Sequence, residues 1–95
     1  MRIVWAARAA AGLQREHAYL SLDNPPAADR IRDRILRAVE SLSQFPASGR
    51  NGRLPNTREL VVTGTPYIAI YRARGDEIVI LAVFHTSRKH PGPIN

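Results

Sequence analysis

The residue types in this 95-residue sequence that could do chemistry are its arginines and three histidines. Histidine can act as a general acid or base near neutral pH, and arginine can stabilise the negative charge of a phosphate. His85 could be such an acid or base. A lone histidine at a strand end is, however, more often a packing or hydrogen-bonding residue than a catalyst.

The same arginines could instead bind an anionic partner. The chain carries a net charge of +6, and Lys89 is its single lysine among 14 basic residues. Guanidinium groups offer a planar fork of donors that suits phosphates and carboxylates. The alternative is a solvated basic surface. The residues expected to bind a target or an acidic protein partner are Arg50, Arg53, Arg58, Arg72, Arg74, Arg88 and Lys89.

Composition excludes several other classes of protein. There is no cysteine, so disulfides, a thiol nucleophile and a cysteine zinc site are excluded, and we expect no metal and no cofactor. No apolar run is long enough for a signal peptide or a membrane span, which indicates a cytoplasmic protein with no membrane partner. His17 is expected to be a surface or half-buried residue rather than a ligand. The length indicates a single domain, residues 1–95.

The apolar spacing predicts the elements that must position these residues. A strand over residues 2–5 precedes a helical hairpin over residues 6–45, made of helices 6–22 and 26–44, with Asp23 or Asn24 capping the second. Residues 47–56 read as a loop. Strands at 58–62, 67–74 and 77–85 form an antiparallel meander, followed by a polar tail over residues 86–95 that contains His90. The fold class is therefore α+β, in the order β-α-α-β-β-β.

A two-residue turn at Gly75-Asp76 predicts the register of the last two strands. Arg74 would pair with Glu77, so the two residue numbers in every pair would sum to 151, and Arg72 would lie opposite Val79. Alternation then predicts which side chains share a face. One face would carry Ile68, Ile70, Arg72, Arg74, Val79, Leu81, Val83 and His85. The other would carry Tyr67, Ala69, Tyr71, Ile78, Ile80 and Phe84. Since both faces are apolar, helices should cover one, and a loop or a partner the other.

Five stretches carry a resemblance to a known family. They are 26–30, which opens the second helix, Phe45-Pro46, which closes it, and the runs 53–61, 67–72 and 83–91. In their order and spacing they resemble the RelE/ParE superfamily of toxins from type II toxin–antitoxin pairs. The resemblance spans nearly the whole chain. It implies a cognate, ParD-like antitoxin whose disordered, often acidic segment folds on the toxin, against the helical hairpin or the second face of the sheet.

The resemblance leaves the molecular target open between two branches. RelE-like proteins cut messenger RNA in the ribosome, and there an arginine typically stands where this chain has Ile68. ParE-like proteins poison DNA gyrase, and Tyr71-Arg72 is similar to that branch. Arg72 lies roughly 13 Å from position 68 along a strand and cannot replace the arginine. We therefore expect a gyrase poison.

One alternative is a metal-independent ribosome-dependent endoribonuclease, for which the resemblance implies a site made of His85 and Arg88, with Arg72 or Arg58. Such a site needs a group that removes the 2′-hydroxyl proton, a cation for the charge on the phosphate and a group that protonates the leaving oxygen. The other alternative is a non-toxic, antitoxin-binding regulator.

Overall fold

The computed structural model describes residues 1–87 and 90–92. A strand and two helices come first, and four strands follow. In chain order the elements are β1 (Arg2–Trp5), α1 (Ala7–Ser21), α2 (Pro25–Glu40), the 3₁₀ turn η1 (Ser41–Ser43), β2 (Arg50–Asn51), β3 (Arg58–Val61), β4 (Tyr67–Arg74) and β5 (Glu77–His85). The expected α+β class is confirmed.

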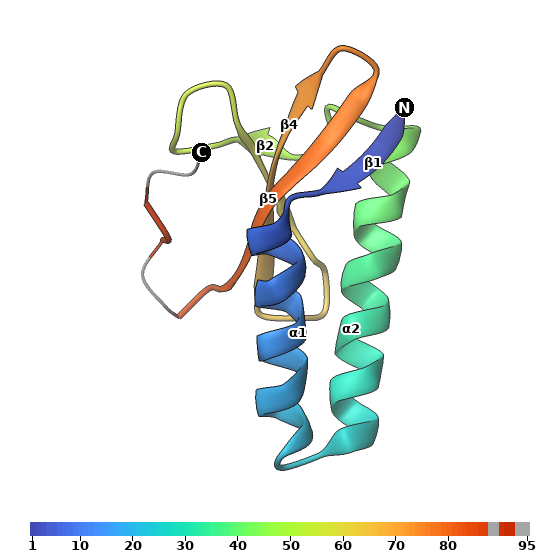
Figure 1. Ribbon diagram of the computed structural model, residues 1–95, viewed down its shortest axis with the longest axis vertical. Helices are drawn as coiled ribbons and strands as arrows, with labels where there is room; N and C mark the ends of the chain where they lie inside the picture. The colour runs from blue at the N-terminus through green and yellow to red at the C-terminus, as the bar shows by residue number, and fades with distance from the viewer. Residues whose placement is uncertain (88–89, 93–95) are drawn as a thin grey trace.

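The strands form one five-stranded mixed sheet. Their order is β1-β5-β4-β3-β2, with β1 parallel to β5 and the other neighbours antiparallel. Figure 1 shows α1 and α2 side by side, against one face of this sheet. Two details differ from the sequence expectation: the stretch expected as a loop contains the short strand β2, and the first strand joins the meander at its edge.

The start of α2 follows local rules. The Asn24 side chain accepts a hydrogen bond from the Ala27 N–H, and two prolines occupy the first turn, where a missing N–H costs nothing. The helix ends at Glu40 and tightens into η1, which is earlier than the expected end at residue 44. Tightening of the last turn satisfies backbone carbonyls that an α-helix leaves free.

The main core lies between the helices and the sheet. Ile35 and Val39 of α2 pack there with Leu42 of η1, each at most 1% exposed. Tyr67 and Tyr71 of β4 enter this core from the sheet. Burial of this apolar surface is the main favourable term that holds the hairpin on the sheet.

A β-bulge in the β4–β5 pair corrects the predicted register. Pairs near the turn sum to 151 as expected, from Arg74↔Glu77 to Tyr71↔Ile80. Beyond the bulge they sum to 152, as in Tyr67↔His85. The expected faces of three residues are therefore wrong: Val83 packs in the helix-side core, Phe84 lies on the second face, and His85 stacks on Tyr67. Because both faces are apolar, alternation alone cannot reveal an extra residue in one strand.

The second face of the sheet carries its own apolar cluster. Its buried members are Ile68, Ile70, Leu81, Ala82 and Phe84. The C-terminal residues contribute to its cover, since the His90 ring lies edge-on to Phe84 with ring centroids 5.4 Å apart. Thr86 N–H also donates to the Pro66 carbonyl at 2.7 Å. The described part of the expected tail is therefore packed against the sheet.

Candidate functional site

A buried carboxylate, Glu59, organises the basic residues of the second half of the chain. It is 2% exposed, and its Oε2 accepts a hydrogen bond from the Arg53 backbone N–H at 3.0 Å. Its Oε1 lies 3.3 Å from Nη2 of both Arg50 and Arg53. The strand β3 thus holds a negative charge under the loop that carries two of the predicted binding arginines.

The electrostatics of Glu59 favour its charged form. Burial raises the pKa of its carboxyl, but the hydrogen bond from the Arg53 backbone and the two guanidinium groups together outweigh burial. The pKa of Glu59 therefore lies below its ordinary value. The two arginine side chains remain about half exposed, so both can still present donors to a ligand.

His90 completes this cluster from the C-terminal segment. Its Nδ1 accepts a hydrogen bond from Gly92 N–H at 3.1 Å. Nε2 is buried and lies 3.7 Å from Oε2 of Glu59. Phe84 contacts two residues of this cluster: the His90 ring lies edge-on to it, and the Arg53 guanidinium lies 5.7 Å from the Phe84 ring centroid. The second sheet face thus combines an aromatic ring, a carboxylate and cations in one place.

Ile68 lies in the apolar part of this face. It is 4% exposed and packs with Ile70, Leu81 and Phe84. The resemblance to nucleases of the superfamily implies a charge-stabilising arginine at this position, whereas this chain has a buried hydrocarbon side chain there.

His85 lies at the end of β5 and contacts neighbouring residues. Its Nδ1 lies 3.1 Å from the Ser87 N–H, which donates to it, and 2.7 Å from the Ser87 hydroxyl. Its ring packs edge-on against Tyr67, with centroids 5.3 Å apart. His85 and His90 therefore lie on opposite faces of the sheet, and His85 does not join the Glu59 cluster.

Arg58 and Arg72 border an open groove beside the Glu59 cluster. The groove has a volume of ≈ 610 Å³ and is also lined by the loop 51–57, including Arg53. Arg58 donates from Nη1 to the Gly49 carbonyl at 2.8 Å, so part of its role is to hold the preceding loop. Arg74 is exposed at the end of β4, opposite Glu77. The predicted residues Arg88 and Lys89 lie outside the described residues.

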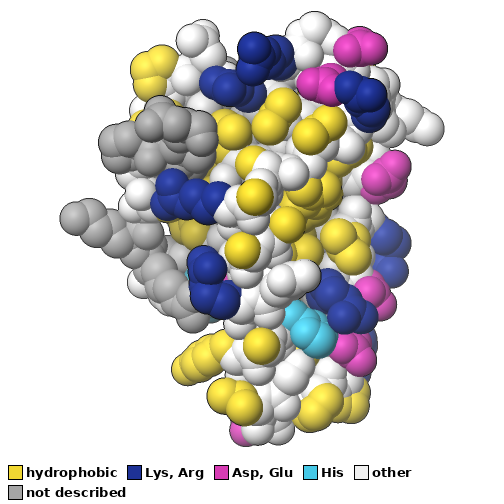
Figure 2. All heavy atoms as spheres, viewed as in Figure 1, with side chains coloured by type: hydrophobic (Ala, Val, Ile, Leu, Met, Phe, Trp, Pro, Cys, Tyr) yellow, Lys and Arg dark blue, Asp and Glu magenta, His cyan; other side chains and the backbone are white. Residues whose placement is uncertain are grey.

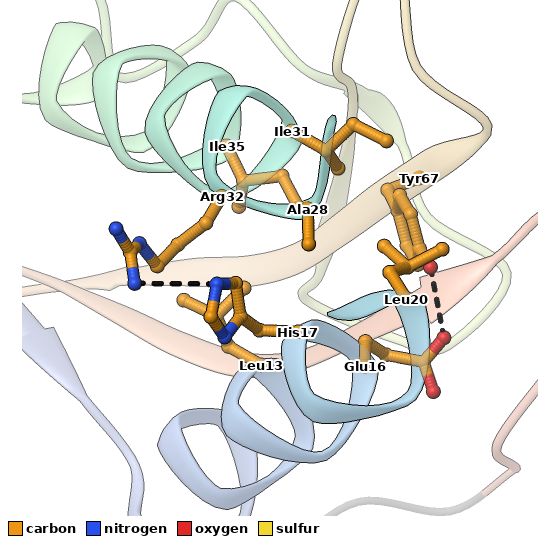
Figure 3. Close-up of a pocket in the computed structure, with 9 residues that line it drawn as sticks. All are labelled: Leu13, Glu16, His17, Leu20, Ala28, Ile31, Arg32, Ile35 and Tyr67. Carbon is orange, nitrogen blue, oxygen red and sulfur yellow. Dashed lines mark hydrogen bonds between the residues drawn. The ribbon is translucent and has the colours of Figure 1, made fainter. Parts of the chain in front are cut away.

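The helical hairpin carries a second group of polar residues, shown in Figure 3. Between the helices, the Tyr67 hydroxyl hydrogen-bonds to Glu16 at 3.0 Å, and apolar side chains fill the remaining space. His17 Nε2 lies 2.7 Å from Asp29 Oδ1, and this hydrogen bond lowers the pKa of Asp29. His17 is about one quarter exposed, as expected for a half-buried structural residue.

An apolar groove runs along the outer side of the two helices. It has a volume of ≈ 410 Å³, and Trp5, Leu13 and Leu36 supply its large apolar side chains. Gln14, His17 and Arg32 lie at the same groove. Figure 2 shows hydrophobic side chains gathered on this face, with basic side chains around them. Such a surface suits an amphipathic segment of another protein.

Three members of the site were not singled out from the sequence. Glu59 and Phe84 were interpreted only as strand residues, and His90 as part of a tail. The available signal for Glu59 was a single carboxylate among Arg50, Arg53 and Arg58, which favours ion pairing. Among the described residues, no group of three His, Asp or Glu side chains could hold a metal ion, and no helix is long and apolar enough to cross a membrane.

The fold and this basic sheet face define a class of small α+β proteins in which a helical hairpin packs on a mixed sheet. Residues 3–90 match the family described as "ParE toxin of type II toxin-antitoxin system, parDE". The chain therefore belongs to the ParE toxin family.

Individual relatives agree with this assignment. The chain is 46% identical over 90 residues to the "Putative toxin Y4kP" of Sinorhizobium fredii, covering 95% of this chain and 93% of the relative. It is 33% identical over 87 residues to "Toxin RelE2" of Caulobacter vibrioides, covering 92% and 97%. It also superimposes on a solved chain of the "Chromosomal ParDE TA system from P. aeruginosa" with a TM-score of 0.80 and 31% identity, over 90% of this chain and 95% of that one.

Proposed function

We propose that this toxin acts in the cytoplasm by binding DNA gyrase and stalling it on cleaved DNA, and that a cognate ParD-like antitoxin neutralises it. The observation that carries the proposal is the environment of Ile68. Its side chain is buried among Ile70, Leu81 and Phe84, where a nuclease of this superfamily would need a cation facing the phosphate. An apolar cluster supplies no stabilisation to a phosphorane.

Two of the other candidate catalytic residues, His85 and Arg58, make contacts within the protein. His85 accepts from the Ser87 N–H at Nδ1 and packs its ring on Tyr67. Arg58 donates to the Gly49 carbonyl. General acid–base catalysis requires a group within hydrogen-bond reach of the reacting proton, and these contacts of His85 favour a structural role at the strand end.

The antitoxin partner is supported by the match to a chain from a ParDE system, by one apolar groove and by the net charge of this chain. The outer groove of the hairpin offers apolar area around Trp5, Leu13 and Leu36, and the net charge of +6 suits an acidic partner. A disordered segment that folds on its target needs both, because apolar burial must offset the entropy that it loses.

The second candidate is a RelE-like endoribonuclease that cuts messenger RNA in the ribosome. It is favoured by the 33% identity to a protein named RelE2 and by the joint presence of Arg53 and His90 on one sheet face. In that case His90, rather than His85, would be the first residue to test as a general acid or base.

Two assays in one tightly controlled expression strain separate these candidates. The first follows plasmid supercoiling and the DNA-damage response, and the second maps new 5′ ends of messenger RNA. We expect relaxed or cleaved DNA with intact transcripts, and inhibition of supercoiling when purified toxin is added to gyrase. New 5′ ends within translated codons, with supercoiling unchanged, would replace the gyrase proposal with the nuclease.

A further inference from the structure

We infer that the groove between the loop 51–57 and the end of β4 binds the phosphodiester backbone of a nucleic acid, so that the toxin contacts DNA or RNA directly. The inference goes beyond inhibition of gyrase, since it concerns the chain alone. It starts from Arg53, Arg58 and Arg72, which line one open groove of ≈ 610 Å³ with no Asp or Glu among its lining residues.

Arg72 gives the groove an unsatisfied donor. Its Nε is buried and has no hydrogen-bond partner among the described residues. A buried donor without a partner is unfavourable, so a ligand oxygen that reaches this guanidinium would satisfy a donor that has no partner among the described residues. The residue lies on the second face of the sheet, next to Ile70, and its neighbour two positions on, Arg74, is exposed on the same side.

The other cations of the groove are already oriented. Arg53 is held by Glu59 through its backbone N–H and one guanidinium nitrogen, and it remains 54% exposed. Arg58 borders the groove, but it pairs with Tyr71 of the helix-side core, and its Nη1 donates to the Gly49 and Ala47 carbonyls. A side chain that is held in place before binding loses less conformational entropy on binding, and the Arg53 guanidinium keeps donors for a ligand.

The lining favours phosphates over an acidic peptide. Besides the arginines, the groove presents Asn51, Asn56 and Thr57, which are short polar side chains of the kind that hold phosphate oxygens. A folding peptide instead needs apolar contacts, and the apolar groove lies on the outer side of the two helices, around Trp5 and Leu36. The loop 52–57 lines the groove, and the groove lies next to the end of β4. In Figure 1 this loop and the turn between β4 and β5 lie at the end of the molecule opposite the α1–α2 turn.

The test is fluorescence anisotropy of a labelled random-sequence oligonucleotide, as duplex DNA and as single-stranded RNA, titrated with purified toxin from about 50 to 200 mM salt. The variants are Arg72→Gln, Arg53→Gln and, as a control with the same charge change, Arg30→Gln, which is exposed on α2. Thermal unfolding of each variant establishes that it is folded.

We expect Arg72→Gln and Arg53→Gln each to weaken binding about 5- to 10-fold at low salt and to reduce the salt slope by about one, because each removes one phosphate contact. Arg30→Gln should leave the slope unchanged.

Equal losses in all three variants, or no binding at the lowest salt, would overturn the inference. If a labelled glutamate-rich peptide bound with the same dependence on Arg53 and Arg72 while the oligonucleotides did not, the groove would be a carboxylate site. Because gyrase is absent from these titrations, failure here and failure of the gyrase proposal are separate outcomes.

Discussion

Glu59 accepts hydrogen bonds from Arg53 at both of its carboxylate oxygens, from the backbone N–H at 3.0 Å and from Nη2 at 3.3 Å. This pair ties the loop before β3 to that strand on the second sheet face, where the carboxylate is 2% exposed. A buried charge is tolerated only when it is paired, so the position of the loop and the charge of Glu59 depend on each other.

Replacement of Glu59 by glutamine should destabilise the fold at neutral pH by about 1–3 kcal/mol, because the amide leaves guanidinium donors without a carboxylate. The folded pKa lies below the ordinary value of 4.5, so the unfolded chain binds the proton first as the pH falls. The contribution of the Glu59 carboxylate to the free energy of unfolding is therefore complete above the ordinary pKa of 4.5, and it is lost as the pH falls through the folded pKa. Urea unfolding at about pH 7 and pH 3 checks this, with a difference between wild type and variant that shrinks in acid. The exposed Glu40→Gln is the control, and an equal effect there would contradict the assignment.

Replacement of Tyr71 by phenylalanine should loosen the loop before β2. The buried hydroxyl accepts from Gly49 N–H at 2.9 Å and donates to the Pro46 carbonyl at 2.8 Å, so its loss should cost about 1–3 kcal/mol. Amide hydrogen exchange at Gly49 should accelerate in the variant. Gly49→Ala should also destabilise, since its Cβ would lie 2.7 Å from the Tyr71 ring and hydroxyl. The double variant should cost less than the sum, because both changes break the same contact; strict additivity would argue against it.

Truncation of the α2 core should test the packing of the hairpin on the sheet. Ile35 is 1% exposed, and Ile35→Ala should cost about 2–4 kcal/mol through lost burial and the cavity left behind. Leu36, its neighbour, is 41% exposed, so Leu36→Ala should cost much less. Denaturant midpoints of the two variants give the comparison. Equal midpoints would mean that this face of α2 is not the one that packs.

Replacement of His85 by asparagine should leave growth inhibition intact if the toxin poisons gyrase. An asparagine oxygen can still accept from the Ser87 N–H, as the histidine Nδ1 does at 3.1 Å, but it cannot act as a general acid or base. Colony counts after induction, with thermal unfolding to confirm a folded variant, give the result. A folded His85→Asn protein that no longer inhibits growth would revive the nuclease proposal with His85 in it.

The order of the elements followed from local signals in the sequence. Pro25, Pro26 and Asn24 set the start of α2 through the geometry of the first turn, and Gly75, with a φ of 61°, marked the hairpin turn between β4 and β5. The apolar spacing of Ile35 and Val39 identified the buried side of α2. These signals are readable because each depends on residues within a few positions of one another. The resemblance to the toxin superfamily likewise followed from the order of short runs.

The site could be predicted only in part, because its contacts join segments far apart in the chain. Sequence reasoning chose Arg50, Arg53 and Arg72 as binding residues from their type, but nothing local showed that Glu59 would be buried beneath the first two. His90 reaches Phe84 and Glu59 only because the chain turns back after β5. The bulge between Ile80 and Ala82, which exchanges the faces of Val83 and Phe84, is also decided by packing on both sides of the sheet. The sequence by itself thus determined the order of the main helices and strands, the charge and the resemblance to the family. The tertiary structure alone decided the strand β2, the bulge and which charged groups meet, since burial and pairing depend on non-local contacts.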